Sequence, residues 1–295
     1  MNKLFNARSV YQISINMILT ILALASILPF LLLVISSFAD ETTLTLNGYS
    51  FFPEKFSLNA YEYLFEQSSM LLRAYGITVL VTAVGTTLSL LITSLLAYPL
   101  SRKDFKKRNI FTFIVFFTML FNGGLVPSYL MWTTVFHIKN TIFALILPNL
   151  LMSAFFVLLM KNYFANNIPP ELIESAKMDG AGEYKVFFKV VLPLSLPILA
   201  TVGLMVGIGF WNDWTNGLYY VTDPDLFSIQ NLLNRILSNI QFLSTNIVSQ
   251  KVNTEMPSTG IRMAIAVIGI IPILILYPFF QRYFVKGITI GAVKG

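Results

Sequence analysis

The chain has 295 residues, of which 56% are hydrophobic and only 12% carry a charge. Soluble domains carry about 25% charged residues, so this composition excludes an ordinary soluble protein and indicates a polytopic membrane protein. The net charge of +6 is then explained by membrane topology, and no nucleic-acid partner is expected. The chain contains no cysteine, which excludes disulfides, a thiolate metal site and a thiol nucleophile.

Six predominantly apolar stretches are candidates for membrane spans, since a span takes about 20 such residues. They cover approximately residues 12–38, 74–100, 109–132, 141–160, 194–216 and 262–281. The first stretch is longer than the core of a signal peptide, which has about 7–15 residues, so we expect an uncleaved span there. The sequence thus predicts an all-α polytopic membrane protein, with a single transmembrane domain over residues 1–295 and six transmembrane helices.

The Lys and Arg residues predict the orientation of these spans. With both termini on one side, that side holds 14 of the 20 basic residues: two before the first span, five between spans two and three, four between spans four and five, and three after span six. The basic side of a membrane protein faces the cytoplasm. We therefore expect both termini and the segment 161–193 in the cytoplasm, and the segments 40–73 and 222–261 outside.

The outer segment 222–261 has apolar residues at helical spacing. These are Leu232, Leu233, Ile236, Leu237 and Ile240. The pattern predicts an amphipathic helix at the outer face of the membrane. Two roles are equally compatible with it: a cover that packs on the helix bundle, and a docking surface for an external partner.

Small polar residues form a stripe on one face of the second span. They are Thr78, Thr82, Thr86, Ser89 and Thr93. Such residues allow close helix packing and hydrogen-bond between helices. They also suit the lining of a sugar pathway, because hydroxyls exchange hydrogen bonds with sugar hydroxyls. Packing is the commoner role, and the two roles are compatible. Asn212, at the outer end of the fifth span, is a further pathway candidate, since polar residues in a membrane usually face protein or water.

The polar segment 161–197 between the later spans contains two predicted short helices. Pro170 and Glu171 suit the first turn of one helix, and Gly180 suits its end. Helices below about 12–15 residues are marginal in water, so this helix needs a surface to lie against. In the second helix, apolar residues recur at i, i+3, i+4 and i+7, namely Tyr184, Phe187, Phe188 and Val191. The plainer alternative is an amphipathic linker at the membrane surface.

The sequence has neither a nucleotide-binding motif nor the intramembrane ionisable residues that would let this chain drive transport by itself. It has no Gly-x-x-x-x-Gly-Lys-Ser/Thr phosphate loop, and its single His137 has no companion for a metal site. No ionisable residue lies well inside a span, which argues against an ion-coupled secondary transporter and against a membrane-embedded enzyme with clustered acids or histidines. No metal site is therefore expected. If the protein moves a solute uphill, the energy comes from a partner.

Three groups of residues in the segment 161–197 resemble a known motif. Glu174-Ser175-Ala176, Asp179-Gly180-Ala181 and Leu192-Pro193 are similar to the EAA motif of permease subunits of bacterial ABC importers. Ser175 stands where alanine is commonest, a change of one small residue for another. Further stretches resemble the maltose-type carbohydrate-uptake permeases and a branch of them that serves oligosaccharide importers; these stretches are 140–143, 168–172, 210–212, 121–127 and 291–295.

The resemblance implies the type I ABC importer permease fold, with a cytoplasmic coupling helix in the bacterial cell membrane. It implies that the chain forms a heterodimer with a second permease and contacts membrane lipid. It also implies two copies of an ABC ATPase and an extracellular solute-binding protein as partners. Such a permease is not an enzyme and binds no cofactor itself, because the partner ATPase uses ATP and Mg. The implied cargo is a sugar, specifically an oligosaccharide; a non-sugar solute is the alternative.

The resemblance also implies roles for single residues. Glu174 would make the polar contact with the ATPase, Ala176 would allow close approach, and Gly180 would allow the turn between the two short helices. Tyr184 and Phe187 would pack the second helix back on the spans.

Overall fold

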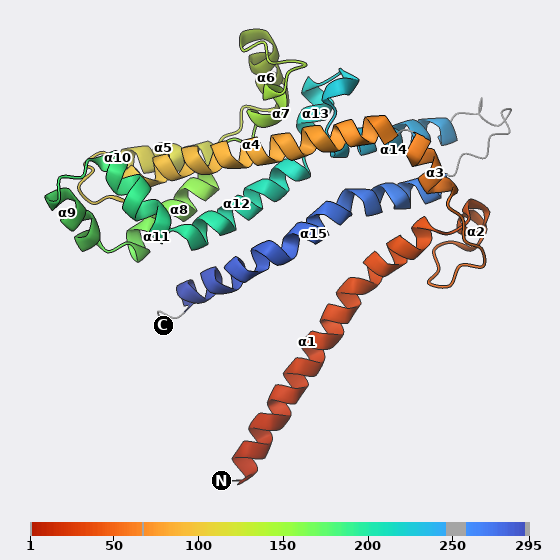
Figure 1. Ribbon diagram of the computed structural model, residues 1–295, viewed down its shortest axis with the longest axis horizontal. Coiled ribbons are helices and arrows are strands. Elements are labelled where there is room, and N and C mark those ends of the chain that lie inside the picture. The colour runs from red at the N-terminus through yellow and green to blue at the C-terminus, as the bar shows by residue number, and fades with distance from the viewer. Residues whose placement is uncertain (1, 67, 246–257, 293–295) are drawn as a thin grey trace. The chain divides into compact units, whose positions relative to one another are not determined.

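A computed structural model describes residues 2–66, 68–245 and 258–292 of the chain (Figure 1). The described residues form helices joined by turns, with one isolated antiparallel bridge between Ala39 and Phe56. The all-α architecture predicted from the sequence is therefore confirmed for this part of the chain. The chain divides into two compact units, Met1–Ser68 with Ile236–Pro272, and Ser69–Arg235 with Ile273–Gly295.

The helices of the described residues follow one another along the chain. In chain order they are α1 (Asn2–Ser37), α2 (Glu41–Asn47), α3 (Asn59–Glu66), α4 (Ser68–Ser101), α5 (Arg108–Leu120), α6 (Leu125–Leu130), η1 (Met131–Val135), α7 (Phe143–Ile146), α8 (Ala154–Asn167), α9 (Pro170–Met178), α10 (Glu183–Val186), η2 (Phe187–Val191), α11 (Leu192–Leu194), α12 (Leu196–Trp211), α13 (Thr215–Tyr220), η3 (Pro224–Leu226), α14 (Ile229–Thr245) and α15 (Ser258–Ala292).

In the first unit, polar and aromatic contacts fix the chain after α1. The rings of Phe38 and Tyr61 stack with their centroids 4.8 Å apart, and the Tyr61 hydroxyl lies 2.8 Å from the Ser37 hydroxyl. The carboxylate of Glu41 accepts hydrogen bonds from the backbone N–H groups of Thr259 and Gly260, each at 2.8 Å. Glu41 thereby satisfies amides of the first turn of α15, which a helix leaves without intrahelical partners.

In the second unit, α4 and α12 lie side by side (Figure 1). The ring of Phe210 fills the space where Gly85 lacks a side chain, because a Cβ at Gly85 would lie only 2.5 Å from that ring. A Cβ at Gly203 would lie 3.1 Å from Leu90. The small residues at positions 203 and 207 therefore pack α12 against α4, as small-xxx-small pairs do in membrane helices.

Two helices of the described chain are long and apolar enough to cross a membrane, Tyr11–Ser37 and Ser68–Ser101. Two bent helix pairs raise the number to four if each pair is one span: Arg108–Leu120 with Leu125–Val135, bent by 112°, and Glu183–Leu194 with Leu196–Trp211, bent by 81°. The six transmembrane helices expected from the sequence are consistent with this count, and their number and extents stay predictions.

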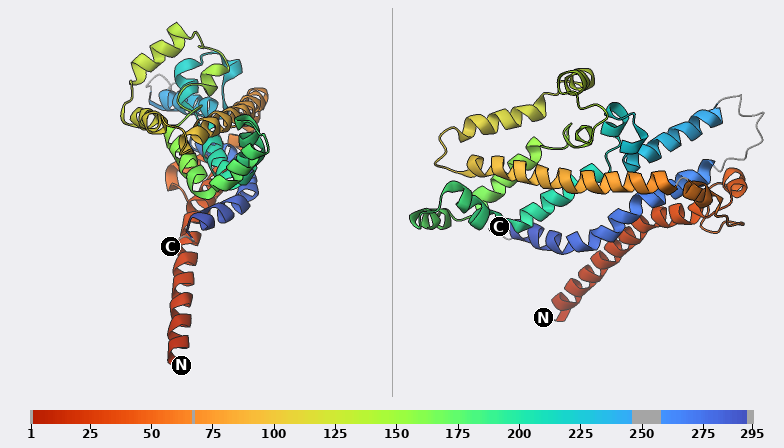
Figure 2. Two further views of the ribbon diagram at one scale, coloured as in Figure 1. Left: turned by 90° about the vertical axis from the view of Figure 1, so that its left-hand side faces the viewer. Right: turned by 45° about the horizontal axis from the view of Figure 1, so that its top comes forward.

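The stretch 109–132 forms two helices rather than one straight helix, and Figure 2 shows the chain turning between α5 and α6. Gly124 has a φ of +85°, which favours glycine, and its N–H donates to the Asn122 side-chain oxygen at 2.9 Å. The stretch 141–160 is also interrupted, because Pro148 is followed by Asn149 at a φ of +63°. The helix that follows, α8, continues to Asn167, into the segment expected to be a cytoplasmic loop.

Candidate functional site

The helix α9 presents the motif residues Glu174, Ser175 and Ala176. It begins with Pro170 in its first turn, where the missing N–H costs nothing, and carries Glu171 at its positive and Lys177 at its negative end. It stops because Gly180 takes a φ of +77°, and the Ala181 N–H closes the end by donating to the Ala176 carbonyl at 3.0 Å.

One face of α9 is exposed and the other is anchored. Ile173 is buried, whereas Glu174, Ser175, Asp179 and Gly180 are exposed, and Ala176 and Ala181 are half-buried. Met178 is 89% exposed beside them. A large apolar side chain next to a carboxylate on a projecting short helix is a surface suited to a protein partner.

The second short helix packs on a different face from the one expected. Phe187, at 2% exposure, and Val191 are buried as predicted, but Tyr184 is 79% exposed and Phe188 is also exposed. The expected packing of Tyr184 against the spans is therefore wrong, and Val186 takes the inward position instead. Tyr184 belongs to α10, and the two expected residues that are buried belong to the π-helical turn over Phe187–Val191 that follows it.

The Leu192-Pro193 pair lies in α11, where the segment 161–193 meets the fifth predicted span. Leu192 is half-buried and Pro193 is exposed. The chain then turns by 81° into α12 at the buried Ser195, whose hydroxyl has no hydrogen-bond partner in the described part of the chain. The motif thus ends at a sharp corner that leads directly into a helix of the core.

Charged residues from three segments meet beside α9. Lys177 Nζ lies 2.5 Å from Glu183 Oε1 and 3.8 Å from Asp104 Oδ2. Arg102 binds Asp104 through Nε at 2.9 Å and Nη2 at 2.5 Å. The hydrogen bonds from Arg102 lower the pKa of Asp104 to about 2, and the hydrogen bond from Lys177 lowers the pKa of Glu183. Both carboxyl groups are therefore held in the ionised form.

This charged cluster was not predicted from the sequence. In the sequence, the run 102–108 indicates only the topology, and Lys177 and Glu183 occupy positions that the motif leaves open. Pairs between segments about 75 residues apart have no signature in one sequence, since ion pairing depends on the fold. The one available signal was the acidic Asp104 inside an otherwise basic run.

A cavity of about 410 Å³ lies between α4 and α12. Its walls include Thr82, Thr86 and Leu90 from α4, and Gly203, Gly207 and Trp211 from α12. The hydroxyls of Thr82 and Thr86 are buried and have no hydrogen-bond partner among the described residues. Buried hydroxyls usually find a partner, so these two can hydrogen-bond to a guest or to water in the cavity.

The other predicted pathway residues lie outside the lining of this cavity. The Thr78 hydroxyl donates to the Ala74 carbonyl and accepts from the Ile229 N–H, both at 2.8 Å. Ser89 is buried, and the Asn212 side chain donates to the Ile208 carbonyl at 3.0 Å at the end of α12. Trp211 also lines the cavity.

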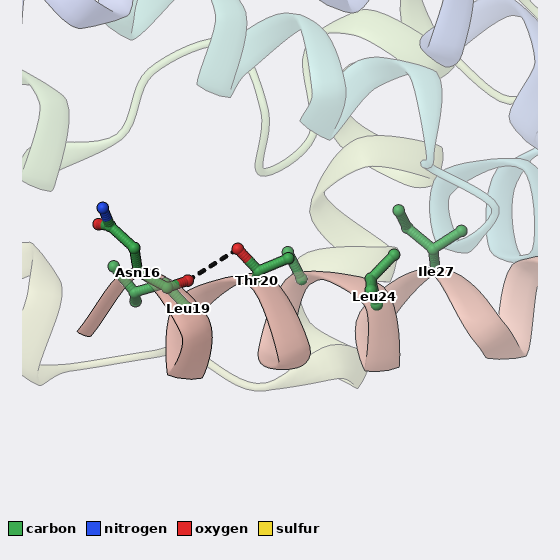
Figure 3. A pocket seen from close by; sticks show the side chains of 6 residues that line it. Asn16, Leu19, Thr20, Leu24 and Ile27 are labelled. Atoms are coloured by element: carbon green, nitrogen blue, oxygen red, sulfur yellow. Dashed lines mark hydrogen bonds between the residues drawn. The ribbon is translucent and has the colours of Figure 1, made fainter. Parts of the chain in front are cut away.

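A second hollow runs along α1 (Figure 3). The labelled residues Asn16, Leu19, Thr20, Leu24 and Ile27 all come from this one helix, and the Thr20 hydroxyl donates to the Asn16 carbonyl at 2.7 Å. A hollow with walls from a single exposed helix is a feature of the helix surface rather than an enclosed site. Within residues 2–66, 68–245 and 258–292, no three His, Asp or Glu residues are grouped for a metal ion.

Residues 85–290 match the family described as "Binding-protein-dependent transport system inner membrane component". The chain belongs to this family. As a member, it is a permease component of an ABC transport system in the inner membrane. This agrees with the apolar helices, and with the expectation that the chain performs no covalent chemistry.

Relatives in the family share most of their length with this permease. Protein LplC of Bacillus subtilis (strain 168) is 40% identical over 270 residues, which cover 92% of this chain and 90% of the relative. The polygalacturonan/rhamnogalacturonan transport system permease protein YtcP of the same strain is 38% identical and covers 94% and 96%. AraQ of Halalkalibacterium halodurans, an arabinooligosaccharides transport system permease protein, is 31% identical and covers 93% of each.

A solved structure has the same fold. It is described as the crystal structure of a bacterial ABC transporter involved in the import of the acidic polysaccharide alginate. One chain of it superposes on this permease with a TM-score of 0.78 and 28% identity, covering 93% of this chain and 96% of that chain. The ABC importer permease fold expected from the sequence is thereby confirmed.

Proposed function

We propose that this permease imports oligosaccharides with energy from a separate ATPase that docks on α9. The observation that carries the proposal is the form of the segment 161–193. It presents Glu174 and Met178 on an exposed helix, closes that helix at a left-handed glycine, and leads through α11 into a wall of the cavity. A rigid short helix seated on a partner can transmit the partner's closure as a lever.

The proposed cargo is an oligosaccharide, with fragments of acidic polysaccharides tested first. Relatives named for polygalacturonan, rhamnogalacturonan and arabinooligosaccharides support this, as does the alginate importer. The cavity supports it chemically, because Thr82 and Thr86 offer hydroxyls and Trp211 offers an aromatic face, the two kinds of group that suit a sugar ring. The proposed pathway therefore runs past Thr82 and Thr86, with Thr78, Ser89 and Asn212 supporting the helices beside it.

The proposed assembly contains this permease, a second and different permease, two ATPase copies that bind ATP and Mg, and an extracellular solute-binding protein. Both termini and the segment 161–193 face the cytoplasm in this arrangement, and the segments 40–73 and 222–261 face outside. The distribution of Lys and Arg supports the orientation. The family description, which names binding-protein-dependent transport, supports the solute-binding protein.

Purification of the complex with its ATPase, followed by reconstitution in liposomes, tests the proposal. Oligogalacturonates, alginate fragments, neutral oligosaccharides and a dipeptide are each presented with the binding protein, and ATP hydrolysis and uptake are measured. We expect saccharides alone to stimulate both. Uptake driven by an ion gradient without the ATPase would contradict the proposal and favour a secondary transporter, and stimulation by the dipeptide would overturn the sugar assignment.

A further inference from the structure

Five polar side chains join the segment around α9 to the end of α4. The Tyr98 hydroxyl donates to Glu183 Oε2 at 3.1 Å and accepts from Arg102 Nη1 at 3.3 Å. Arg102 holds Asp104, and Lys177 binds Glu183 and approaches Asp104. The hydrogen bonds and ion pairs therefore form a closed ring over α4, the turn after it, α9 and α10, which the Lys177–Asp104 ion pair completes at 3.8 Å.

An aromatic contact supports the polar ring. The Tyr98 and Phe187 rings lie 5.4 Å apart between centroids, and both side chains are buried. Isolated exposed ion pairs add little to the stability of a fold. Here a buried tyrosine places its hydroxyl between a cation and a carboxylate, and charge-assisted hydrogen bonds of this kind are the stronger and more directional ones.

The ring spans the turn at Gly180, which joins α9 to α10. Lys177 precedes the left-handed Gly180 and Glu183 follows it, so their contact fixes α9 relative to α10. At the same time, Tyr98 belongs to α4, the helix that carries Thr82 and Thr86 into the cavity. A continuous helix with a rise of about 1.5 Å per residue joins Thr86 to Tyr98 over about 18 Å.

We propose that Tyr98, Arg102, Asp104, Lys177 and Glu183 form a tether that transmits movement of α9 to α4 during transport. They are positioning residues, since none of them lies in the cavity wall. Through the tether, a displacement of α9 reaches one wall of the cavity by α4, while the corner at Ser195 carries it to the other wall by α12. The inference rests on the proposed function, because it takes the ATPase to act on α9.

The test compares ATP hydrolysis with uptake in proteoliposomes that contain the whole importer. Tyr98→Phe removes the hydroxyl and keeps the ring against Phe187, and Glu183→Gln removes the charge. We expect each variant to assemble in normal amounts and to hydrolyse ATP at the basal rate. The ATP consumed per saccharide transported should rise about ten-fold or more, the size expected from the loss of one charge-assisted hydrogen bond. A role in folding alone would lower the amount of complex without changing this ratio.

Tyr163→Phe is the matched control, because Tyr163 lies on α8 in the same cytoplasmic segment and no hydrogen bond of its hydroxyl is seen in the described chain. It should keep the wild-type ratio. The effect of the double variant of Tyr98→Phe with Glu183→Gln should be smaller than the two single effects combined, since both changes weaken the contact between Tyr98 and Glu183. Lys177→Ala, at a partly exposed position, serves if a buried change prevents assembly.

The possible results distinguish a failure of the tether from a failure of the proposed function. If no ATPase joins the wild-type permease, the proposed function fails, and the tether fails with it. If the wild-type importer couples ATP to uptake and all three variants keep its ratio, the tether alone is overturned. Independent, additive effects of Tyr98→Phe and Glu183→Gln would also overturn it.

Discussion

At the scale of single residues, the threonines of α4 divide into two kinds. Thr78 joins helices, because its hydroxyl donates to Ala74 and accepts from the N–H of Ile229. Thr82 and Thr86 place buried hydroxyls in the cavity with no partner among the described residues. The same residue type in one stripe therefore has a structural role at one position and a proposed binding role at two others.

Valine substitutions should separate these two roles. Thr78→Val leaves the buried Ile229 N–H without an acceptor, so we expect the free energy of unfolding to fall by about 1–3 kcal/mol. Thr82→Val with Thr86→Val should leave stability unchanged, because no hydrogen bond is lost, and should weaken saccharide uptake at least about three-fold. Thermal unfolding in detergent and uptake per folded transporter are the measurements. Normal uptake by the double variant would remove these threonines from the pathway.

Arg102 should control the protonation of Asp104. The pKa of Asp104 is lowered from 3.8 to about 2, mainly by the hydrogen bonds from Arg102. A carboxyl with a lowered pKa in the folded protein stabilises it above the unfolded value of 3.8, and this contribution is lost as the pH falls toward about 2.

In Arg102→Gln, we therefore expect Asp104 to titrate closer to 3.8. The infrared carboxyl band of the aspartates, assigned by subtraction of Asp104→Asn, reports this titration. At about pH 3, Asp104 should be mostly ionised in the wild type and mostly protonated in the variant. Lys103→Gln is the control for loss of a nearby positive charge and should leave the titration unchanged. A titration that does not respond to Arg102 would contradict the assigned cause.

At the scale of helices, the packing of α4 on α12 depends on the absence of a side chain at Gly85. A Cβ there would overlap the Phe210 ring, whereas a Cβ at Gly76 in the same helix meets no atom within 4 Å. Gly85→Ala should therefore lower the free energy of unfolding by about 1–3 kcal/mol, as overpacking does. Gly76→Ala should leave it equal or raise it. Thermal unfolding of both variants measures the difference, and equal midpoints would show that α12 is not packed this closely.

The turn between α9 and α10 makes a second prediction at this scale. Gly180→Asp places a Cβ at a φ of +77°, which costs about 1–2 kcal/mol, and should uncouple ATP hydrolysis from uptake while the permease stays in the membrane. Gly182→Asp is the matched control, because Gly182 has a φ of −70° at the start of α10, where aspartate is a favoured N-cap. Wild-type transport by Gly180→Asp would remove this turn from the coupling mechanism.

The helix bounds could be predicted from the sequence where the residues that set them lie within a few positions of each other. Pro170, Glu171 and Gly180 gave the bounds of α9 because caps and turns act within a few residues. The face of the next helix was wrong at Tyr184, because the apolar spacing does not show which residues of its first turn, α10, face inward. The breaks at Asn122–Gly124 and at Pro148 were hidden inside apolar stretches, where composition alone favours one continuous span.

At the scale of the whole molecule, composition and charge predicted the class of protein, because the bilayer acts on every residue of a span. The motif in the segment 161–193 predicted the family, which the comparisons confirm. The cavity and the tether could not be predicted in the same way. Each brings together residues from separate helices, such as Tyr98 with Glu183 and Thr86 with Gly207, and a single sequence carries no record of such pairs.

We expect a separate ATPase to act on α9 from the cytoplasm, and the absence of cysteine makes a direct test available. Glu174→Cys and Tyr49→Cys introduce one thiol each at exposed positions, the second in the expected outer segment. A reagent that is thiol-reactive at one end and photoreactive at the other is then applied to membranes that contain the intact importer, and after illumination the cross-linked product is identified by mass spectrometry. We predict that Glu174→Cys joins the ATP-binding subunit and that Tyr49→Cys does not. A cross-link to that subunit from Tyr49→Cys, or none from Glu174→Cys in an active importer, would contradict the account.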